Sequence, residues 1–431
     1  MKFYIHTLGC KVNAYESEVM ANNLKKSGFK LASDNELADI YIINTCTVTN
    51  NASNKSKKMI NHYKKLNKDA IIVVCGCFSQ FIKGKIDGVD IVIGNKDKSK
   101  IVSLINELVD ENKKINKIYD MKNEKFEDMY LDNFESKTRA FVKIQDGCNN
   151  FCSYCIIPYV RGNIRSKDIN KVYDEINTLV NMGHKEIVLT GIHTGHYGKD
   201  INSNLTALLK KISDIKNLKR IRISSIEITE LDNEFLDELK NNKLIVDHMH
   251  IPLQAGSDSI LKKMNRKYDT KYFYDKIKEI RSIRPDISIT TDIIVGFPGE
   301  TIEEFNETVE FAKKIKFTKI HVFPFSSREG TPAASMPNQL TNDEKKRRVH
   351  ILAQVSNDLE IEYRNKFIGR KMEVLFENKK DDYFIGHTSN YLEVKIKSDE
   401  NLKNKLIEVE IIWHIYNFML LYTLSIRGKC I

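Results

Sequence analysis

The sequence has little proline, a single tryptophan and no hydrophobic run long enough to span a membrane. It contains 7 prolines in 431 residues and shows no low-complexity tract or solenoid-type repeat. The one long apolar run, from Ile411 to Ile426, includes His414 and Asn417 and is shorter than the roughly 20 residues that cross a bilayer. No secretory signal is visible, since Met1–Cys10 is typical of a strand and a loop. We therefore expect a cytoplasmic protein without membrane contact.

Composition and charge indicate a globular protein with more than one domain. Of the 431 residues, 41% are hydrophobic and 29% are charged, which is enough for a sizeable core. The formal net charge of +10 fits a polyanionic partner such as RNA, although a lysine-rich solvated surface gives the same balance. Eight cysteines in a large cytosolic chain favour metal or redox chemistry over disulfides.

Residues 1–110 alternate short apolar strands with amphipathic helices, which predicts an α/β domain with a mostly parallel sheet covered on both faces. Residues 111–137 are rich in charge and weakly periodic, and we interpret them as a linker. The predicted strands are Lys2–Thr7, Ile40–Asn44, Ile71–Cys75 and Asp90–Ile93, and the predicted helices include Tyr15–Ser27 and Asn51–Leu66.

Residues 138–366 form a second alternating block, and about six strand–helix units predict an incomplete (β/α)6 barrel. Chemistry in such barrels lies at the carboxyl ends of the strands. Five residues lie just after the ends of predicted strands: Cys148, Gly191, Ser225, Gln254 and Gly296. The predicted strands are Phe141–Gln145, Glu186–Thr190, Arg220–Ser224, His248–Leu253, Ile287–Val295 and Lys319–Phe323, and the predicted helices include Asn170–Met182, Leu231–Lys240, Lys271–Arg284, Ile302–Ile315 and Asn342–Asn365.

Residues 367–431 alternate polar and apolar positions, as in Met372–Phe376, Tyr391–Ile396 and Leu406–Ile411. Alternation between polar turns predicts a small antiparallel β-barrel. The end of the chain is unusually apolar after Ile411, and Cys430 has no role that the pattern assigns.

Three cysteines, Cys148, Cys152 and Cys155, have C-x₃-C-x₂-C spacing. They supply three thiolates on one loop, whereas a structural zinc site or a typical iron–sulfur cluster has four ligands. A zinc knuckle is the competing interpretation, but no Cys or His lies between Ile156 and Asn181. The loop resembles the cluster loop of the radical S-adenosylmethionine (SAM) superfamily. This resemblance implies a 4Fe-4S cluster with one open iron, which binds SAM for reductive cleavage to a 5′-deoxyadenosyl radical.

Cys10, Cys46 and Cys77 each follow a predicted strand. Parallel neighbouring strands place their end loops together, so these thiols can converge on one metal. A lone cysteine is usually a small buried hydrophobe, and that interpretation suits Cys75. The contexts of the three cysteines resemble the N-terminal domain of the methylthiotransferases, which implies a second 4Fe-4S cluster with one open iron. In the family's pattern Cys77 is the third ligand and Cys75 is an extra thiol.

Further motifs resemble the same family and imply contacts with SAM. Tyr154 matches its aromatic residue near the adenine, and Gly191 lies in the segment that resembles its site for the amino group. Ser225, Glu227 and Gln254 lie in other matching motifs, where glycine turns let the backbone approach a ligand.

The C-terminal strands, at residues 367–376 and 386–394, resemble a TRAM domain, which is a small β-barrel that binds tRNA. A purely structural cap is the alternative. The resemblance as a whole implies two 4Fe-4S clusters and SAM as cofactors, tRNA as a partner, a flavodoxin- or ferredoxin-like electron donor and an unidentified sulfur donor.

The residues after Cys10 most resemble the branch of the family that acts on threonylcarbamoyladenosine. Lys11, Val12 and Asn13 follow Cys10, whereas the isopentenyladenosine branch typically has Gln-Met-Asn there. The resemblance implies methylthiolation of C2 of N6-threonylcarbamoyladenosine next to the anticodon, without a catalytic acid or base. The alternatives are a methylthiotransferase for isopentenyladenosine tRNA or for a ribosomal-protein aspartate, and a non-catalytic iron–sulfur protein that binds tRNA.

Overall fold

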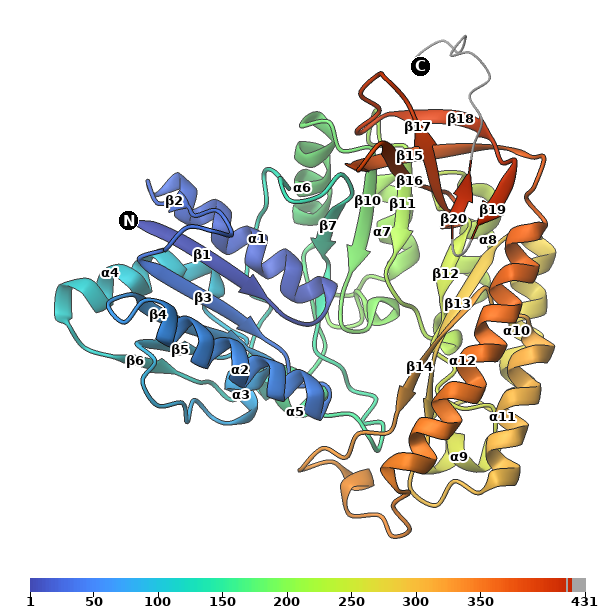
Figure 1. Ribbon diagram of the computed structural model, residues 1–431, viewed down its shortest axis with the longest axis horizontal. Coiled ribbons are helices and arrows are strands. Elements are labelled where there is room, and N and C mark those ends of the chain that lie inside the picture. Colours follow the sequence, from blue (N-terminus) through green and yellow to red (C-terminus); the bar gives the residue numbers. More distant parts are fainter. Residues whose placement is uncertain (416–417, 421–431) are drawn as a thin grey trace.

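The computed structural model describes residues 1–415 and 418–420, so Cys430 and the end of the apolar run lie outside the described residues. Figure 1 shows an N-terminal part with helices around a sheet, a central open barrel and a C-terminal sheet at the top of the view. No helix in the described part of the chain is long and apolar enough to cross a bilayer.

The N-terminal part is a parallel sheet of six strands with helices on both faces, as the sequence predicts. Successive residues of a strand face opposite sides, so Val73 packs into the core under α1 and α4, whereas Val74 packs into the core under α2 and α3. In spatial order the strands are β2 (Lys30–Leu31), β1 (Lys2–Thr7), β3 (Ile40–Thr45), β4 (Ile71–Gly76), β5 (Ile91–Ile93) and β6 (Ile115–Lys117), and the helices are α1 (Lys11–Lys26), α2 (Asn50–Leu66), α3 (Cys77–Phe81) and α4 (Ile101–Glu111).

The predicted linker is more ordered than its weak periodicity indicates. Strand β6 lies within it and pairs in parallel with β5 through Ile115 and Ile91. Further along, Met129, Leu131 and Phe134 are buried in the core of the barrel. A strand of three residues is too short to produce a visible alternation, which explains why the sequence pattern did not reveal it.

The central part confirms the incomplete (β/α)6 barrel. Two parallel sheets of three strands each are connected by a bridge between Ile221 and Ile245, and one apolar core lies between the strands and the outer helices. The strands are β7 (Ala140–Lys143), β10 (Glu186–Thr190), β11 (Arg220–Ile223), β12 (His248–His250), β13 (Ser288–Val295) and β14 (Lys319–Pro324), and the helices are α6 (Ile169–Asn181), α7 (Leu205–Ile212), α8 (Asn233–Asn241), α10 (Thr270–Ile283), α11 (Ile302–Ile315) and α12 (Asn342–Asn365).

Short elements hold the loops at the ends of the barrel strands. The loop with Cys148 follows β8 (Gln145–Asp146) and precedes α5 (Ile157–Arg161), and β8 pairs with β9 (Arg165–Ser166). The other short elements are α9 (Asp258–Lys263) and the 3-10 turns η1 (Lys98–Lys100), η2 (Met121–Asn123), η3 (Thr194–His196), η4 (Ile228–Glu230) and η5 (Pro332–Ala334).

The C-terminal part is a curled sheet of six strands (Figure 1), which agrees with the small antiparallel barrel predicted. Its neighbours are antiparallel except for β17 and β20, which pair in parallel. In spatial order the strands are β18 (Leu406–Glu410), β15 (Lys371–Lys380), β16 (Tyr383–Thr388), β17 (Glu393–Lys397), β20 (Phe418–Leu420) and β19 (Trp413–Ile415).

A buried arginine fastens the C-terminal sheet to the barrel. Arg220, at the start of β11, donates to the backbone oxygens of His387 at 3.0 Å and Glu373 at 2.8 Å. Its side chain is 5% exposed and also pairs with the carboxylate of Glu373. Strand β11 thus fixes the position of the C-terminal sheet, which the sequence predicts to bind tRNA.

Replacing Arg220 should loosen this contact. Arg220→Met removes hydrogen bonds from a charged donor, worth about 1.5–3 kcal/mol each, and leaves two carbonyls without their partner. We expect limited proteolysis after α12 to become at least about tenfold faster. Arg370→Met is the control, since Arg370 and Asp286 form an exposed pair worth about 0–1 kcal/mol. Equal cleavage rates in the two variants would contradict the role of Arg220.

Candidate active site

Cys10, Cys46 and Cys77 come together at the carboxyl edge of the N-terminal sheet. They follow β1, β3 and β4 respectively, as parallel topology predicts. Gly9 has φ of +102°, and a Cβ on it would lie 3.0 Å from Cys46 Sγ, so the turn into Cys10 leaves no room for a side chain. Burial, with the nearby Cys77 and Cys10 thiols, raises the pKa of Cys46 to about 11.

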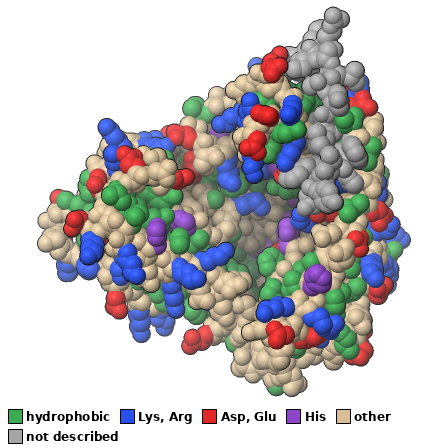
Figure 2. All heavy atoms as spheres, in the orientation of Figure 1, with side chains coloured by type: hydrophobic (Ala, Val, Ile, Leu, Met, Phe, Trp, Pro, Cys, Tyr) green, Lys and Arg blue, Asp and Glu red, His purple; other side chains and the backbone are tan. Residues whose placement is uncertain are grey.

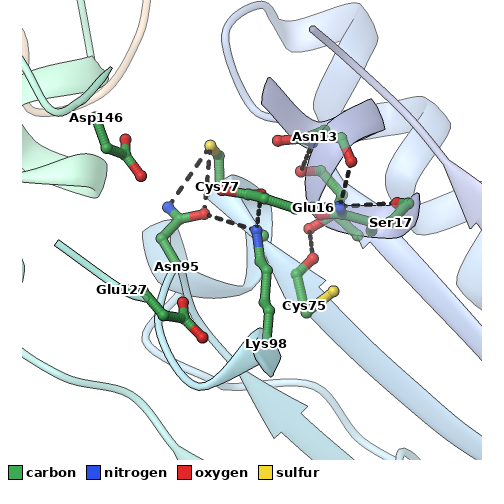
Figure 3. A network of polar contacts seen from close by, with 12 residues as sticks. Asn13, Glu16, Ser17, Cys75, Cys77, Asn95, Lys98, Glu127 and Asp146 are labelled. Atoms are coloured by element: carbon green, nitrogen blue, oxygen red, sulfur yellow. Dashed lines mark hydrogen bonds and ion pairs between the residues drawn. The ribbon is translucent and has the colours of Figure 1, made fainter. Parts of the chain in front are cut away.

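Cys75 is separate from this group. It lies on β4 and is fully buried in the apolar core with Phe3 and Ile42, and burial raises its pKa to about 12. Cys77 follows the sharp turn at Gly76, whose φ is +101°, and Figure 3 shows the two thiols pointing in different directions. Cys75 is thus a thiol of the apolar core, whereas Cys77 lies with Cys10 and Cys46 at the edge of the sheet.

The sulfur of Cys77 accepts hydrogen bonds from two buried side chains. Arg161 Nε lies 3.2 Å from Cys77 Sγ, and Asn95 Nδ2 lies 3.6 Å from it. Arg161 ends α5, which directly follows the loop with Cys155, and its Nη2 donates to Asn13 Oδ1 at 2.7 Å. One side chain therefore connects the barrel's cysteine loop to the N-terminal thiols.

A buried network of charges holds Arg161 in this position. Arg161 Nη1 lies 3.1 Å from Glu16 and 3.0 Å from Asp146. Lys143 pairs with the same two carboxylates at 2.7 Å each, and Lys98 also pairs with Glu16. Although burial opposes ionisation, Arg161 and Lys143 hold the pKa values of Glu16 and Asp146 below their usual range. Glu16 and Lys98 belong to the N-terminal part and the others to the barrel, so the network joins the two.

Cys148, Cys152 and Cys155 form the second group of thiols. Burial raises the pKa of Cys148 to about 11 and that of Cys155 to about 12, and the neighbouring Cys152 contributes to both shifts. Arg266 Nη1 donates to Cys152 Sγ at 3.3 Å. In each group, one sulfur therefore accepts a hydrogen bond from an arginine that is shielded from solvent.

Glu227 is bound to this loop through other side chains. Its carboxylate pairs with Arg266 at 2.6 Å and accepts a hydrogen bond from Asn150 Nδ2 at 2.6 Å. His193 lies 3.3 Å from the same carboxylate and 3.9 Å from Cys148 Sγ. Glu227 thus positions Arg266 beside the thiols, and its direct contact with SAM stays a prediction.

The other predicted SAM residues lie past the strand ends or on the cysteine loop. A Cβ on Gly191 would lie 2.9 Å from Gln145 Oε1, so a larger residue there would require the Gln145 side chain to shift. Gln254 has φ of +69°, a strained conformation that is typical of functional sites. Ser225 follows β11, and Tyr154 packs partly buried against the barrel core. Their roles in binding SAM also stay predictions.

Sequence reasoning missed Arg161, Arg266 and Asn95, because no spacing connects them to the cysteines. One signal was available. Lys143 lies inside the predicted strand Phe141–Gln145, and a charge in a buried parallel strand requires a partner. That signal indicates a buried ion pair but does not identify Glu16 as the partner.

Comparisons with known proteins identify the class. Residues 142–312 match the Radical SAM superfamily, and residues 2–94 match a family described as Uncharacterized protein family UPF0004. The radical S-adenosylmethionine methyltransferase TsrM from Kitasatospora setae has a similar fold, with a TM-score of 0.58 and 15% identity over 77% of this chain and 76% of that chain. Together with the C-x₃-C-x₂-C loop, these matches define a radical SAM protein.

Closer relatives identify the family. The chain is 42% identical over 418 residues to the threonylcarbamoyladenosine tRNA methylthiotransferase MtaB of Bacillus subtilis (strain 168), covering 94% of this chain and 93% of the relative. It is 36% identical over 425 residues to the tRNA-2-methylthio-N(6)-dimethylallyladenosine synthase of Clostridium botulinum (strain Hall), covering 95% and 94%. The chain belongs to the radical SAM methylthiotransferase family.

Neutralising Glu16 should destabilise the protein strongly. Glu16→Gln leaves Lys98 and Lys143 short of a buried anion, which costs about 3–5 kcal/mol, so we expect a clear fall in the thermal midpoint at pH 7. The folded state lowers the pKa of Glu16. The ionised carboxylate therefore stabilises the fold at pH values above its unfolded pKa of about 4, and this stabilisation is lost as the pH falls towards the pKa of the folded state. The difference between variant and wild type should therefore persist down to about pH 5 and shrink below about pH 4.

Glu36→Gln is the matched control for this measurement by scanning calorimetry. Glu36 pairs with Lys2 on the surface, where such a pair contributes about 0–1 kcal/mol. If Glu16→Gln lowered the midpoint no more than Glu36→Gln, the network would not hold the two parts together.

Proposed function

We propose that this protein is a tRNA methylthiotransferase that converts N6-threonylcarbamoyladenosine, next to the anticodon, to 2-methylthio-N6-threonylcarbamoyladenosine. The observation that carries the proposal is the pair of thiol groups, Cys148, Cys152 and Cys155 in the barrel and Cys10, Cys46 and Cys77 in the N-terminal part, connected by Arg161. The 42% identity to the Bacillus subtilis relative supports the nucleoside.

The two groups of thiols fit two 4Fe-4S clusters with one open iron each. Each group offers three sulfur ligands, and the remaining cysteine of the described residues, Cys75, is in the apolar core. We assign the barrel thiols to the cluster that binds SAM and the N-terminal thiols to the cluster that carries sulfur. When bound, the clusters and SAM supply the radical and the sulfur that substitution at C2 requires.

The chain's own residues hold and shield these groups. Arg161 and Asn95 donate to Cys77, and Arg266 donates to Cys152, which balances negative charge on sulfur. Hydrogen on C2 of adenine is not acidic, so the reaction requires no histidine or carboxylate as a base, and we assign none.

For partners, we propose tRNA, bound by residues 367–431 and by the net positive charge of the chain. An electron donor of the flavodoxin or ferredoxin type would reduce the SAM-binding cluster, and the sulfur donor is unassigned. A cytoplasmic location follows from this substrate.

The second candidate substrate is isopentenyladenosine (dimethylallyladenosine) tRNA, because the Clostridium botulinum relative is named a tRNA-2-methylthio-N(6)-dimethylallyladenosine synthase. Reconstituted protein with SAM, a reductant and either modified tRNA distinguishes the two, with the methylthio nucleoside measured by mass spectrometry. We expect product from the threonylcarbamoyladenosine tRNA and none from Cys148→Ala. Product only from isopentenyladenosine tRNA would refute the proposed substrate, and activity in Cys148→Ala would refute the radical role.

Iron content tests the assignment of ligands. The reconstituted protein should hold about eight irons per chain, and Cys46→Ala should hold about four. Cys75→Ala is the matched control and should retain about eight, because its thiol lies in the apolar core. Loss of about four irons from Cys75→Ala, with Cys46→Ala unchanged, would reverse the assignment.

A further inference from the structure

Two histidines and an aspartate face the inside of the open barrel on neighbouring strands. Ile293 of β13 and Met249 of β12 belong to the core between strands and helices. Adjacent residues of a strand face opposite ways, so Asp292 and His250 point into the barrel. His321 of β14 is paired in register with Asp292 and lies on the same face of the sheet. Figure 2 shows this side of the molecule hollowed at its centre, with His side chains beside the hollow.

The three side chains are close enough to share one metal ion. His250 Nε2 lies 3.3 Å from Asp292 Oδ2, and one ligand atom from each of the three residues lies within 4.8 Å of the others. Ligands at about 2.0–2.2 Å from a tetrahedral zinc ion are about 3.3–3.6 Å apart. His321 is exposed, so a small rotation of its side chain would complete this geometry.

His250 has the orientation of a metal ligand. Its Nδ1 lies 2.9 Å from Thr290 Oγ1, which leaves Nε2 to face Asp292. A hydrogen bond to one ring nitrogen is the usual way in which a protein orients a metal-binding histidine. Burial lowers the pKa of His321, so its ring is neutral at pH 7, which is the form that binds metals.

Asp292 and His321 have no other polar partner for their ligand atoms. Among residues 1–415 and 418–420, no hydrogen bond involves the carboxylate of Asp292 or the ring of His321, and the ion pair of Asp292 is the one with His250. Arg222, on the neighbouring strand β11, binds Glu186 at 2.6 Å. Asp292 is thus a carboxylate on the barrel wall without a lysine or arginine partner in the described part of the chain.

A second group of two histidines and a carboxylate shows the contrast. His193, His196 and Glu230 also have ligand atoms within 4.8 Å of one another. Here, however, His196 Nε2 lies 2.8 Å from Glu230, and Lys199 pairs with the same carboxylate at 3.1 Å. The chain supplies its own cation to this group, whereas it supplies none to Asp292 within the described residues.

We propose that His250, Asp292 and His321 bind a divalent transition-metal ion, for which Zn²⁺ is the best match to two imidazoles and one carboxylate. Three protein ligands leave a fourth position open, as in catalytic zinc sites. This position faces the hollow, so water or an oxygen atom of a bound ligand can occupy it. The site contains no cysteine and goes beyond the proposed function.

Zinc binding to the reconstituted holoenzyme tests the site without turnover. Both groups of thiols hold iron in this form, so they do not compete for the added metal. We expect about one zinc ion per chain after equilibrium dialysis against Zn²⁺, measured by elemental analysis. His321→Gln and Asp292→Asn should each weaken binding at least about 100-fold, because loss of even an outer partner of a metal ligand costs about 10- to 100-fold.

His62→Gln is the matched control and should bind zinc as wild type does, because His62 is an exposed histidine on α2. Iron content and the thermal midpoint of each variant should equal those of wild type, which separates loss of a ligand from loss of the fold or of a cluster.

X-ray absorption at the zinc edge of the wild-type protein tests the ligands without any substitution. We expect nitrogen and oxygen neighbours at about 2.0–2.2 Å and no sulfur at about 2.3 Å. A sulfur neighbour would mean that zinc binds thiols and would overturn the proposal. Failure of wild type to retain zinc, or equal affinity in wild type, His321→Gln and Asp292→Asn, would overturn it as well.

Discussion

The pairing of Arg161 with two buried carboxylates is the interaction on which the arrangement of the site depends. Transfer of a guanidinium from water costs on the order of several kcal/mol, and here Glu16 and Asp146 offset that cost. Glu16 comes from α1 and Asp146 from β8. The same contacts that neutralise Arg161 therefore fix the N-terminal part against the barrel, and they place Arg161 Nε on Cys77 Sγ. Across a purely apolar interface the N-terminal part could shift slightly against the barrel. Here such a shift is costly, because it would separate buried charges.

One topological rule produces both groups of thiols. Loops at the carboxyl ends of parallel strands meet, so three cysteines far apart in sequence converge past β1, β3 and β4. In the barrel the same edge carries the loop with Cys148, Cys152 and Cys155. The two groups differ in how the sequence encodes them. The barrel thiols form one compact motif, whereas the N-terminal thiols meet only after residues 1–77 have folded. This difference explains why the barrel motif alone identifies a superfamily, whereas the dispersed set narrows it to a family.

The sequence predicted the alternation of strands and helices, because a period is a local property that a single chain displays. It predicted the residues of both thiol groups from the spacing of one set and from the rule that the ends of parallel strands meet. It did not predict Arg161 or Arg266, since a buried cation next to sulfur depends on contacts between distant segments. Strand β6 was missed for a different reason, because Ile115–Lys117 is too short to show a period. The choice of Cys77 over Cys75 came from the resemblance to the family and not from their spacing. The turn at Gly76 separates them, and such a change of direction is a backbone property that residue spacing does not reveal.

The cations of the buried network hold the structure together and do not bind substrate. Lys98, Lys143 and Arg161 are buried and have carboxylate partners in the chain, so they require nothing from a ligand. A cation with an internal partner would have to exchange it to bind a substrate, and the exchange would cancel most of the gain in free energy.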